Sequence, residues 1–408
     1  MIQEFVNKNF FLLFLFTLVF GVIFYDTIGF NFTDEICALC LLVLYGIHVF
    51  NSKNWGFNKL FLITISVFIF YLIYSLYIGS NTKGTIILDF IIQIKPYIGF
   101  FCVYAIAPTL TKNQKVILKQ FAIIFTLYLL LIGLVSLGYD KIIDYTLGHE
   151  SRFATAISIL ALIYLYSSDY NTKDKLSFIL ILCVGVISGR SKFYGFFAIS
   201  TFVVLYVNKS FEMKFNLKNT CFLLIAVAGV LFVAKDKLIL YFVEGGFGGD
   251  RETADLYARI ALYYFSVPVL CDHIPFGSGF ASYATYASSV NYSSIYTEYN
   301  MDYLYGLSRD NPKFMADTYY PALAQFGFVG VVLFFWFWLY LVKRAIKAFL
   351  AGFKKESVAA LLIIFFFLIE CTSDSTITHN RGLFMMMLLG LIFGDVKNGE
   401  KALQRREQ

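Results

Sequence analysis

Long apolar runs separated by short polar stretches dominate this 408-residue chain. A helix needs about 20 apolar residues to cross the hydrocarbon core of a bilayer, and fewer when it is buried among other helices. The runs therefore predict an all-α polytopic membrane protein with about twelve membrane-spanning helices, the first of which lacks the A-x-A site of a cleaved signal. The predicted spans are Asn9 to Tyr25, Glu35 to Phe50, Leu60 to Ile78, Thr85 to Ala107, Gln120 to Leu137, Phe153 to Tyr166, Leu176 to Ser188, Phe193 to Val207, Thr220 to Ala234, Pro321 to Val342, Val358 to Glu370 and Leu383 to Phe393.

Basic residues gather in every second loop between these spans. Because Lys and Arg are disfavoured in short translocated loops, we expect the basic loops and both termini on the cytoplasmic side. The basic set includes Lys53, Lys59, Lys112 to Lys119, Lys173, Lys175, Lys209 to Lys218, Lys343 to Lys355 and Lys397 to Arg406. The expected organisation is nine spans in residues 1–234, a large outer loop in 235–320, three spans in 321–394 and a cytoplasmic tail in 395–408.

The outer loop, residues 235–320, is the longest stretch between predicted spans and holds thirteen of the 29 tyrosines. Tyrosine has an apolar ring and a polar tip, so a loop rich in Tyr, Ser and Asn suits a folded cap whose tyrosines stack on sugars or touch lipid headgroups. An aromatic belt of helices lying on the membrane surface is the alternative interpretation.

Composition supports the membrane assignment and excludes two other classes of protein. Hydrophobic residues make up 59% and charged residues 15% of the chain, against about a quarter charged in a soluble domain. The net charge of +6 is spread without a long basic run, which argues against a nucleic-acid partner. Most of the seven cysteines fall in apolar runs, where Cys behaves as a small hydrophobe, so we expect no disulfide.

Arg190 interrupts an apolar stretch between two predicted spans, within the sequence Ser188-Gly189-Arg190-Ser191-Lys192. An arginine at such a turn is costly unless it meets water, a phosphate or a partner, and its planar guanidinium suits a phosphate. A snorkelling arginine that only ends the helix is the alternative.

Two further arginines, Arg251 and Arg259, lie in a helical stretch of the outer loop. Arg251 has acidic neighbours, Asp250 and Glu252, with which it can pair. Arg259 stands at the start of an apolar run, where it can bind a phosphate or pair with Asp255 one helical turn earlier.

The block Asp272-His273-Ile274-Pro275-Phe276-Gly277-Ser278-Gly279 predicts a tight turn. The exposed backbone amides of Gly277 and Gly279 are candidates to receive an oxygen anion. His273 beside Asp272 is either an oriented base or a structural turn histidine.

Polar residues also mark the approaches to the last three spans. Asp317 holds a carboxylate at the entrance of the tenth span, where a helix cap is the alternative role. His379 and Arg381 lie in a short outer turn and are expected at the rim of a cavity under the cap. Within the fourth span, Lys95 near Asp89 is either a functional site or a buried pair.

The sequence contains none of the usual patterns for metal or nucleotide binding. There is no H-E-x-x-H motif, no DxD pair and no Gly-rich phosphate loop before a helix. We therefore expect neither a metal site nor a cofactor.

Together these features resemble the bacterial O-antigen polymerase and ligase superfamily. The resemblance rests on twelve spans, the long outer loop between the ninth and tenth, and several motifs from about Leu176 to Phe335. The motifs are Ser188-Gly189-Arg190-Ser191, Arg259 leading to His273-x-Pro275-x-Gly277-x-Gly279, and Asp317-Thr318-x-Tyr320 before Gln325-x-Gly327-x-x-Gly330.

Within that superfamily the chain is more similar to Wzy-type polymerases than to ligases. Ligases typically carry a His where this chain reads Met315-Ala316-Asp317, and Asp317-Thr318-x-Tyr320 is similar to polymerases. The resemblance implies a GT-C-like architecture and an enzyme of the bacterial inner membrane that works at the periplasmic face. It would transfer a glycan from undecaprenyl diphosphate to a sugar hydroxyl of another lipid-linked repeat. The implied partners are undecaprenyl-diphosphate-linked oligosaccharide, membrane lipids, a chain-length regulator and a flippase.

Diphosphate is already a good leaving group, so the enzyme chiefly needs cations that stabilise the developing charge and a correctly positioned acceptor hydroxyl. We therefore expect Arg190 and Arg259 to bind the diphosphate and Asp317 to act as a base or to orient the hydroxyl. The residues expected to bind substrate are Arg251, His273, Gly277, Gly279, Tyr320, His379 and Arg381.

Two other functions stay open on the sequence. A ligase that transfers polysaccharide to lipid A-core would share the topology. A transporter or flippase for lipid-linked glycans would also be apolar with charged residues lining a cavity, but it is expected to show two related halves with paired broken helices. The single asymmetric cap argues against the transporter.

Overall fold

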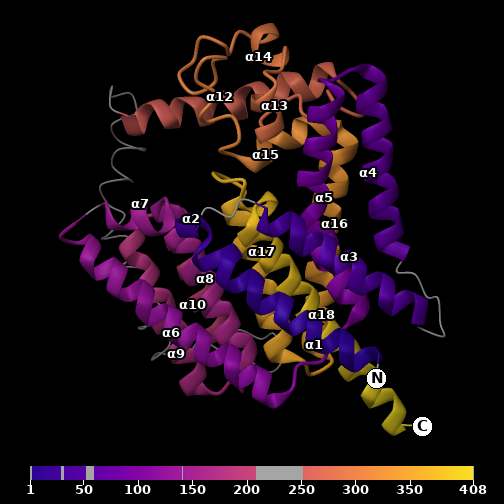
Figure 1. The fold of residues 1–408 in the computed structure, drawn as a ribbon, viewed down its shortest axis with the longest axis vertical. Coiled ribbons are helices and arrows are strands. Elements are labelled where there is room, and N and C mark those ends of the chain that lie inside the picture. Colours follow the sequence, from indigo (N-terminus) through magenta and orange to yellow (C-terminus); the bar gives the residue numbers. More distant parts are fainter. Residues whose placement is uncertain (1, 29–31, 52–58, 140, 208–250, 408) are drawn as a thin grey trace.

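The computed structural model describes residues 2–28, 32–51, 59–139, 141–207 and 251–407, and these ranges contain helices and loops but no β-strand (Figure 1). The first group of elements is α1 (Ile2–Phe16), the π-helical turn η1 (Thr17–Ile23), α2 (Tyr25–Ile28), α3 (Thr33–Asn51), α4 (Lys59–Ile78), α5 (Lys83–Ile106), α6 (Lys112–Ser136), α7 (Ile142–Leu147), α8 (Glu150–Ser167), α9 (Thr172–Gly185), the 3-10 turn η2 (Val186–Ser188) and α10 (Ser191–Tyr206). The second group is α12 (Arg251–Asp272), α13 (Tyr286–Val290), α14 (Ile295–Glu298), α15 (Tyr319–Ala322), the 3-10 turn η3 (Leu323–Phe326), α16 (Gly327–Leu350), α17 (Lys354–Glu370), the 3-10 turn η4 (Thr376–Thr378) and α18 (Asn380–Glu407).

Seven helical segments of the described ranges are long and apolar enough to cross a membrane. They are α1 with η1, α3, α4, α5, α6, the run from α15 through α16, and α18. The shorter helices α8, α9, α10 and α17 lie on four further predicted spans. The ninth predicted span, Thr220 to Ala234, lies outside the described residues. The all-helical, polytopic class is therefore confirmed, whereas the count of twelve spans stays a prediction.

The centre of the bundle is formed by α8, α17 and α18, whose apolar side chains are almost all buried. Close approach of α18 to α5 requires two glycines. A Cβ atom at Gly390 would lie 2.6 Å from the carbonyl oxygen of Phe100, and one at Gly99 would lie 2.7 Å from Cδ1 of Leu383. Small residues let helix backbones approach in this way when hydrocarbon, rather than water, surrounds the bundle.

Both described chain ends lie at the same end of the bundle (Figure 1). Asn7 in α1 donates a hydrogen bond to Oγ1 of Thr109 in the α5–α6 connection, at 2.9 Å. Lys115 at the start of α6 pairs with Asp395 in α18, at 3.3 Å. The two termini and a basic loop therefore share one side of the bundle, as the alternation of Lys and Arg predicts.

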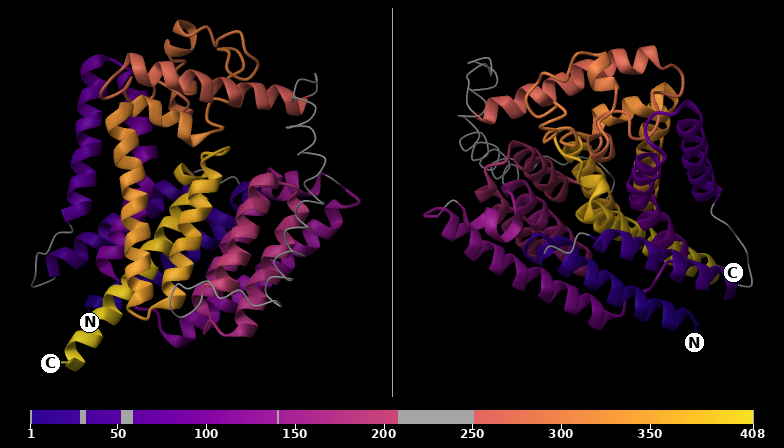
Figure 2. Two further views of the ribbon diagram at one scale, coloured as in Figure 1. Left: turned by 180° about the vertical axis from the view of Figure 1, so that it is seen from behind. Right: turned by 45° about the horizontal axis from the view of Figure 1, so that its top comes forward.

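A folded cap, residues 251–318, lies at the opposite end, where α12 runs across the molecule and contacts η3 and α16 (Figures 1 and 2). The cap has its own hydrophobic core, in which Tyr283 and Tyr296 are fully buried. These two tyrosines are structural, so the expectation that the loop tyrosines stack on sugars is wrong for them. The fully buried carboxylate of Asp89 on α5 accepts a hydrogen bond from the backbone N–H of Ala281 at 2.7 Å and ties the cap to the bundle.

Candidate functional site

Arg190 lies where α9 and α10 meet, as the sequence predicts. The chain turns there because Gly189 adopts a left-handed conformation, with φ of 64°, and Arg190 immediately precedes α10. Its guanidinium makes a close contact with the carboxylate of Glu150, and its Nη2 lies 2.9 Å from Nε2 of His149. Burial alone would raise the pKa of Glu150, but the hydrogen bond and charge of Arg190 hold it below its usual range. Arg190 is therefore one half of an ion pair rather than a simple helix end.

Arg259 on α12 pairs with Asp317, whose Oδ2 accepts from Nη2 at 2.8 Å. The side chains remain 28% and 32% exposed, so both can reach a ligand. The side chain of Asp255, the alternative partner, lies outside the described residues. Asp317 is not the cap of the next helix, because Thr318 occupies that position before α15. Two residues predicted for separate roles therefore face each other.

Asp374, in the loop between α17 and α18, accepts three hydrogen bonds. Its Oδ2 receives Nζ of Lys192 at 2.8 Å and Oγ of Ser151 at 3.1 Å, and its Oδ1 receives Oγ1 of Thr376 at 2.8 Å. Burial alone would raise the pKa of Asp374, but the Lys192 ammonium outweighs it and lowers that pKa. Nζ of Lys192 also lies 2.6 Å from Oε2 of Glu370. Asp374 and Glu370 were not among the predicted site residues.

The α17–α18 loop also contacts the cap through two hydrogen bonds. Oγ of Ser375 donates to the carbonyl of Ala316 at 2.6 Å, and the hydroxyl of Tyr263 donates to the carbonyl of Thr372 at 2.7 Å. Because Ala316 precedes Asp317, this loop connects the Arg259–Asp317 pair with the Lys192–Asp374 pair. The resulting group of charged and imidazole side chains is called the cap-side cluster below. It comprises His149, Glu150, Arg190, Lys192, Arg259, Asp317, Glu370, Asp374 and His379.

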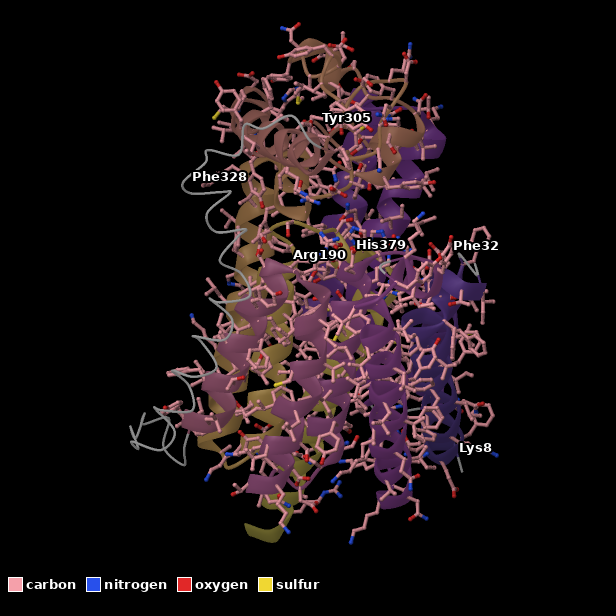
Figure 3. All side chains as sticks on the ribbon, turned by 90° about the vertical axis from the view of Figure 1, so that its left-hand side faces the viewer. Lys8, Phe32, Arg190, Tyr305, Phe328 and His379 are labelled. Carbon is pink, nitrogen blue, oxygen red and sulfur yellow. The ribbon has the colours of Figure 1, made fainter. Side chains whose placement is uncertain are left out.

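His379 ends the loop, and its side chain is exposed to solvent. Its Nδ1 lies 2.8 Å from the carbonyl oxygen of Ser375, which can only accept a hydrogen bond. Arg190 and His379 lie at the level where the bundle meets the cap (Figure 3). His379 therefore lies at the level of the cap, and its place at the rim of a cavity stays a prediction.

Arg381 has a different setting from the other predicted cations. Its side chain is only 6% exposed, and Nη2 donates to the carbonyl of Val22 in the π-helical turn of the first helix, at 3.3 Å. It packs helices together, and we do not include it in the cluster. Arg251 begins α12, but its side chain lies outside the described residues.

The turn around Gly277 and Gly279 is structural. The N–H of Gly277 donates to the carbonyl of His273 at 2.7 Å, and that of Gly279 to the carbonyl of Gln325 at 2.8 Å. Both amides are therefore occupied, which removes the reason for expecting an anion there. Gly277 is needed because a Cβ would lie 2.2 Å from the backbone nitrogen of Gly327.

His273 and Tyr320 also make contacts outside the cluster. Nδ1 of His273 bonds the carbonyl of Val269 at 3.0 Å, whereas Asp272 accepts instead from the hydroxyl of Tyr299 at 2.7 Å. Tyr320 donates to the carbonyl of Leu368 at 2.8 Å. The oriented Asp272–His273 pair considered from the sequence is thus replaced by two separate contacts.

Lys95 forms a buried ion-pair group with residues of α3 rather than with the cap. Its Nζ lies 2.5 Å from Asp34 and 2.6 Å from Glu35, both on α3. The expected neighbour, Asp89, bonds the cap instead. The buried-pair interpretation of Lys95 therefore holds, with partners from another helix.

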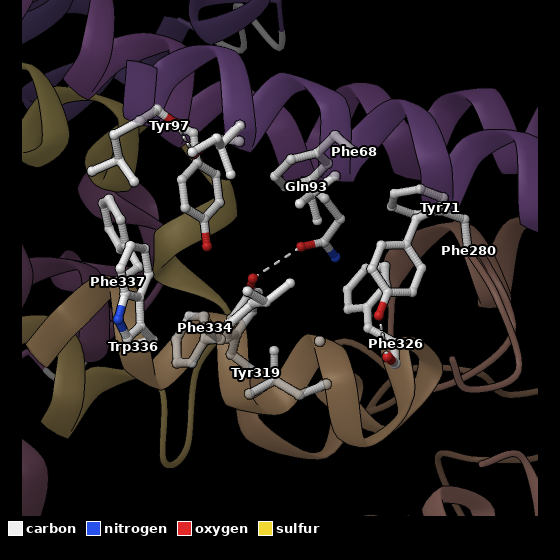
Figure 4. A pocket seen from close by; sticks show the side chains of 17 residues that line it. Phe68, Tyr71, Gln93, Tyr97, Phe280, Tyr319, Phe326, Phe334, Trp336 and Phe337 are labelled. Atoms are coloured by element: carbon white, nitrogen blue, oxygen red, sulfur yellow. Dashed lines mark hydrogen bonds between the residues drawn. The ribbon is translucent and has the colours of Figure 1, made fainter. Parts of the chain in front are cut away.

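A mostly apolar pocket of about 90 Å³ lies between α4, α5 and α16 (Figure 4). The hydroxyl of Tyr319 donates to Oε1 of Gln93 at 3.1 Å, and the hydroxyl of Tyr97 points into the pocket. Its other walls are aromatic and aliphatic, so the pocket suits a hydrocarbon chain better than a sugar. Tyr319 lies two residues from Asp317, which brings the pocket near the cap-side cluster.

Several cations, two exposed imidazoles and partly exposed carboxylates thus meet at one end of an apolar bundle. Arginine forks of this kind bind phosphate oxygens with two parallel hydrogen bonds. In the described ranges, no group of three or more His, Cys, Asp and Glu side chains is arranged to hold a metal ion. The cluster is therefore suited to bind an anionic group and to move a proton.

Comparison with known proteins adds no relative to this picture. No model of a known protein family matches the chain, and no curated protein matches it either. The helical bundle, its cap and the cap-side cluster therefore carry the functional argument alone.

Proposed function

We propose that this chain is a glycosyltransferase that polymerises O antigen or a related surface polysaccharide, as the Wzy-type enzymes that it resembles do. It would join undecaprenyl-diphosphate-linked oligosaccharide repeats at the periplasmic face of the bacterial inner membrane. The observation that carries the proposal is that the segments holding Arg190 and Arg259 both contact the α17–α18 loop. Lys192, two residues after Arg190, donates to Asp374 of that loop. Ala316, beside the Arg259 partner Asp317, accepts a hydrogen bond from Ser375 of the same loop.

The chemistry of the donor explains why two arginines are needed. When the bond to the sugar breaks, negative charge develops on the leaving diphosphate, and fixed cations stabilise it. Glu150 and Asp317 hold the two guanidiniums in the free protein. Ion pairs with this much solvent access contribute little stability, so phosphate oxygens can replace the carboxylates.

The proposal includes the topology. Twelve spans, a periplasmic cap and cytoplasmic termini would place the cap-side cluster at the outer membrane–water boundary. The common location of both chain ends away from the cap supports this orientation. The apolar pocket beside Tyr319 would accommodate part of a hydrocarbon chain, which suits a lipid-linked substrate.

The test is an electrophoretic ladder of surface polysaccharide from the source strain with and without the gene, read beside a blot for lipid-linked glycan. A polymerase predicts that the deletion strain shows core with a single repeat. Long lipid-linked chains that never reach core would identify a ligase. Loss of even the single repeat would identify a transporter, and either of these results would overturn the proposal. Reintroducing the wild-type gene should restore the ladder.

A further inference from the structure

His379 has one ring nitrogen fixed and the other free. Because the carbonyl of Ser375 can only accept, Nδ1 of His379 must carry the proton in their 2.8 Å hydrogen bond. The neutral ring then presents Nε2 as a hydrogen-bond acceptor. Within the part of the chain that the structure describes, Nε2 has no hydrogen-bond partner, and the side chain is exposed. This arrangement is the one that a general base requires.

Ser375 connects this imidazole to Asp317. The carbonyl of Ser375 fixes His379, and its hydroxyl bonds the carbonyl of Ala316, the residue before Asp317. Asp317 in turn faces Arg259 at 2.8 Å. His379 is therefore linked to Arg259, the arginine that we assign to the diphosphate, through Ser375 and the Ala316-Asp317 segment.

The other candidate bases are already engaged. Asp317 shares Oδ2 with Arg259, and a carboxylate in an ion pair is a weak proton acceptor. His149 has Nδ1 against the N–H of Ser151 at 3.2 Å and Nε2 against Arg190 at 2.9 Å. Only His379 in the described part of the cluster combines a fixed tautomer with an accessible lone pair.

We propose that Nε2 of His379 is the catalytic base of the glycosyl transfer. This inference rests on the proposed function. As the acceptor oxygen forms its bond to the anomeric carbon of the donor, the hydroxyl proton passes to Nε2. The bond from that carbon to the diphosphate oxygen breaks, and its electron pair leaves with undecaprenyl diphosphate. The imidazolium then returns its proton to solvent.

The charges around His379 suit this role. Partial enclosure by protein atoms lowers its pKa below the ordinary value, so the ring is neutral at pH 7. The carboxylate of Asp374 favours the imidazolium, whereas Arg152 on α8 and Lys95 on α5 oppose it. The net effect is a ring that starts neutral and has an anion nearby when it accepts the proton.

The experiment measures kcat and KM of the purified full-length protein in lipid nanodiscs, with lipid-linked repeat as substrate, between pH 5 and 8.5. For wild type we expect kcat to fall on the acid side as the imidazole protonates. For His379→Gln we expect kcat to drop by about 100-fold or more, with KM changed by less than about 3-fold and the acid limb lost. Imidazole added to His379→Ala should restore part of the rate.

His48→Gln is the control. That ring lies in the last turn of α3, near Lys397 of α18 and at the end of the bundle opposite the cap. We expect its kcat to stay within about 2-fold of wild type.

Several results would overturn the inference. One is a wild-type kcat that does not fall on the acid side of the pH range. This result does not depend on the folding of any variant. Another is a kcat of His379→Gln within about 3-fold of the wild-type kcat, measured while wild type polymerises. That result would reject His379 as the base but would leave the proposed polymerase function standing. Wild-type protein that makes no polymer from the lipid-linked repeat would remove the proposed function and the base together.

Discussion

Asp317 accepts a hydrogen bond from Arg259 at 2.8 Å, across 58 residues of sequence. The two residues were expected to act separately, one on the hydroxyl and one on the diphosphate. Their pairing means that removing either one also changes the other, so single substitutions alone do not assign their roles.

Exchanging Arg259 and Asp317 distinguishes a role in ion pairing from a role in phosphate binding. We expect Arg259→Gln to abolish polymer at normal protein level, and Arg259→Asp combined with Asp317→Arg to keep the thermal stability of wild type but still to make no polymer. The reason is that the exchange keeps the ion pair but moves the cation that would meet the diphosphate. Gel analysis of polysaccharide and a melting curve in detergent measure the two effects. Long chains made by the exchanged protein would show that the pair is only structural.

We expect the role of Arg190 to depend on the planar, two-pronged guanidinium as well as on its positive charge. Arg190→Lys keeps the cation but loses the two parallel hydrogen bonds to a phosphate, so we expect the rate to fall about 10-fold or more. Arg309→Gln is the control, because that guanidinium lies in the cap, 5.8 Å from the ring of Tyr292. Equal rates for Arg190→Lys and wild type would show that a point charge is sufficient. The measurement is polymer formed per unit time from lipid-linked repeat.

Asp374 is expected to stabilise the fold through Lys192. Asp374→Asn should lower the free energy of unfolding by about 1–3 kcal/mol, because it leaves a buried ammonium with a weakened partner. A double-mutant cycle with Lys192→Met, read from melting in detergent, gives the coupling between the two. Simple additivity would mean that the 2.8 Å contact contributes nothing.

The pH dependence of this contribution has a defined sign. Lys192 lowers the pKa of Asp374 in the folded protein. The stabilisation is therefore fully present above the unfolded value of about 4 and is lost only as the pH falls further. The difference in melting temperature between wild type and Asp374→Asn should thus shrink as the pH falls below about 4. A difference that persists unchanged down to about pH 2 would contradict the assignment.

Packing of α5 against α18 gives a prediction about stability alone. Gly390→Ala places a Cβ 2.6 Å from the carbonyl oxygen of Phe100, and we expect a loss of about 1–3 kcal/mol. Gly195→Ala in α10 is the control, because its Cβ would meet no atom within 4 Å. That exchange should be neutral or stabilise by up to about 1 kcal/mol. Melting curves that rank the two variants the other way would contradict this account of the helix contact.

The helices and the charged candidates could be predicted from the sequence because both signals are local. Apolar runs of the right length predict helices, and Arg190, Arg259 and Asp317 stand out against apolar or loop surroundings. The partners could not be predicted, because they come from distant segments. Lys192 and Asp374 are 182 residues apart, and Lys95 pairs with α3 rather than with Asp89 on its own helix.

The Gly277–Gly279 turn shows the opposite error. A Pro-Gly turn with free amides is a reasonable anion site when only local conformation is considered. In the structure those two amides donate hydrogen bonds to the carbonyls of His273 and Gln325. Gly277 packs against the segment around Gly327, which is distant in the sequence and therefore cannot be identified from the local pattern.

The contact between Asp89 and the cap constrains how a bulky substrate can enter. Lifting the cap away from α5 would strip the N–H of Ala281 from a carboxylate that has no access to water. Such an orphaned buried charge is costly, so this edge acts as a fixed hinge. On the proposed function, a glycan would therefore enter from the side of the molecule remote from the α4–α5 hairpin, and the chain would grow away from that hairpin.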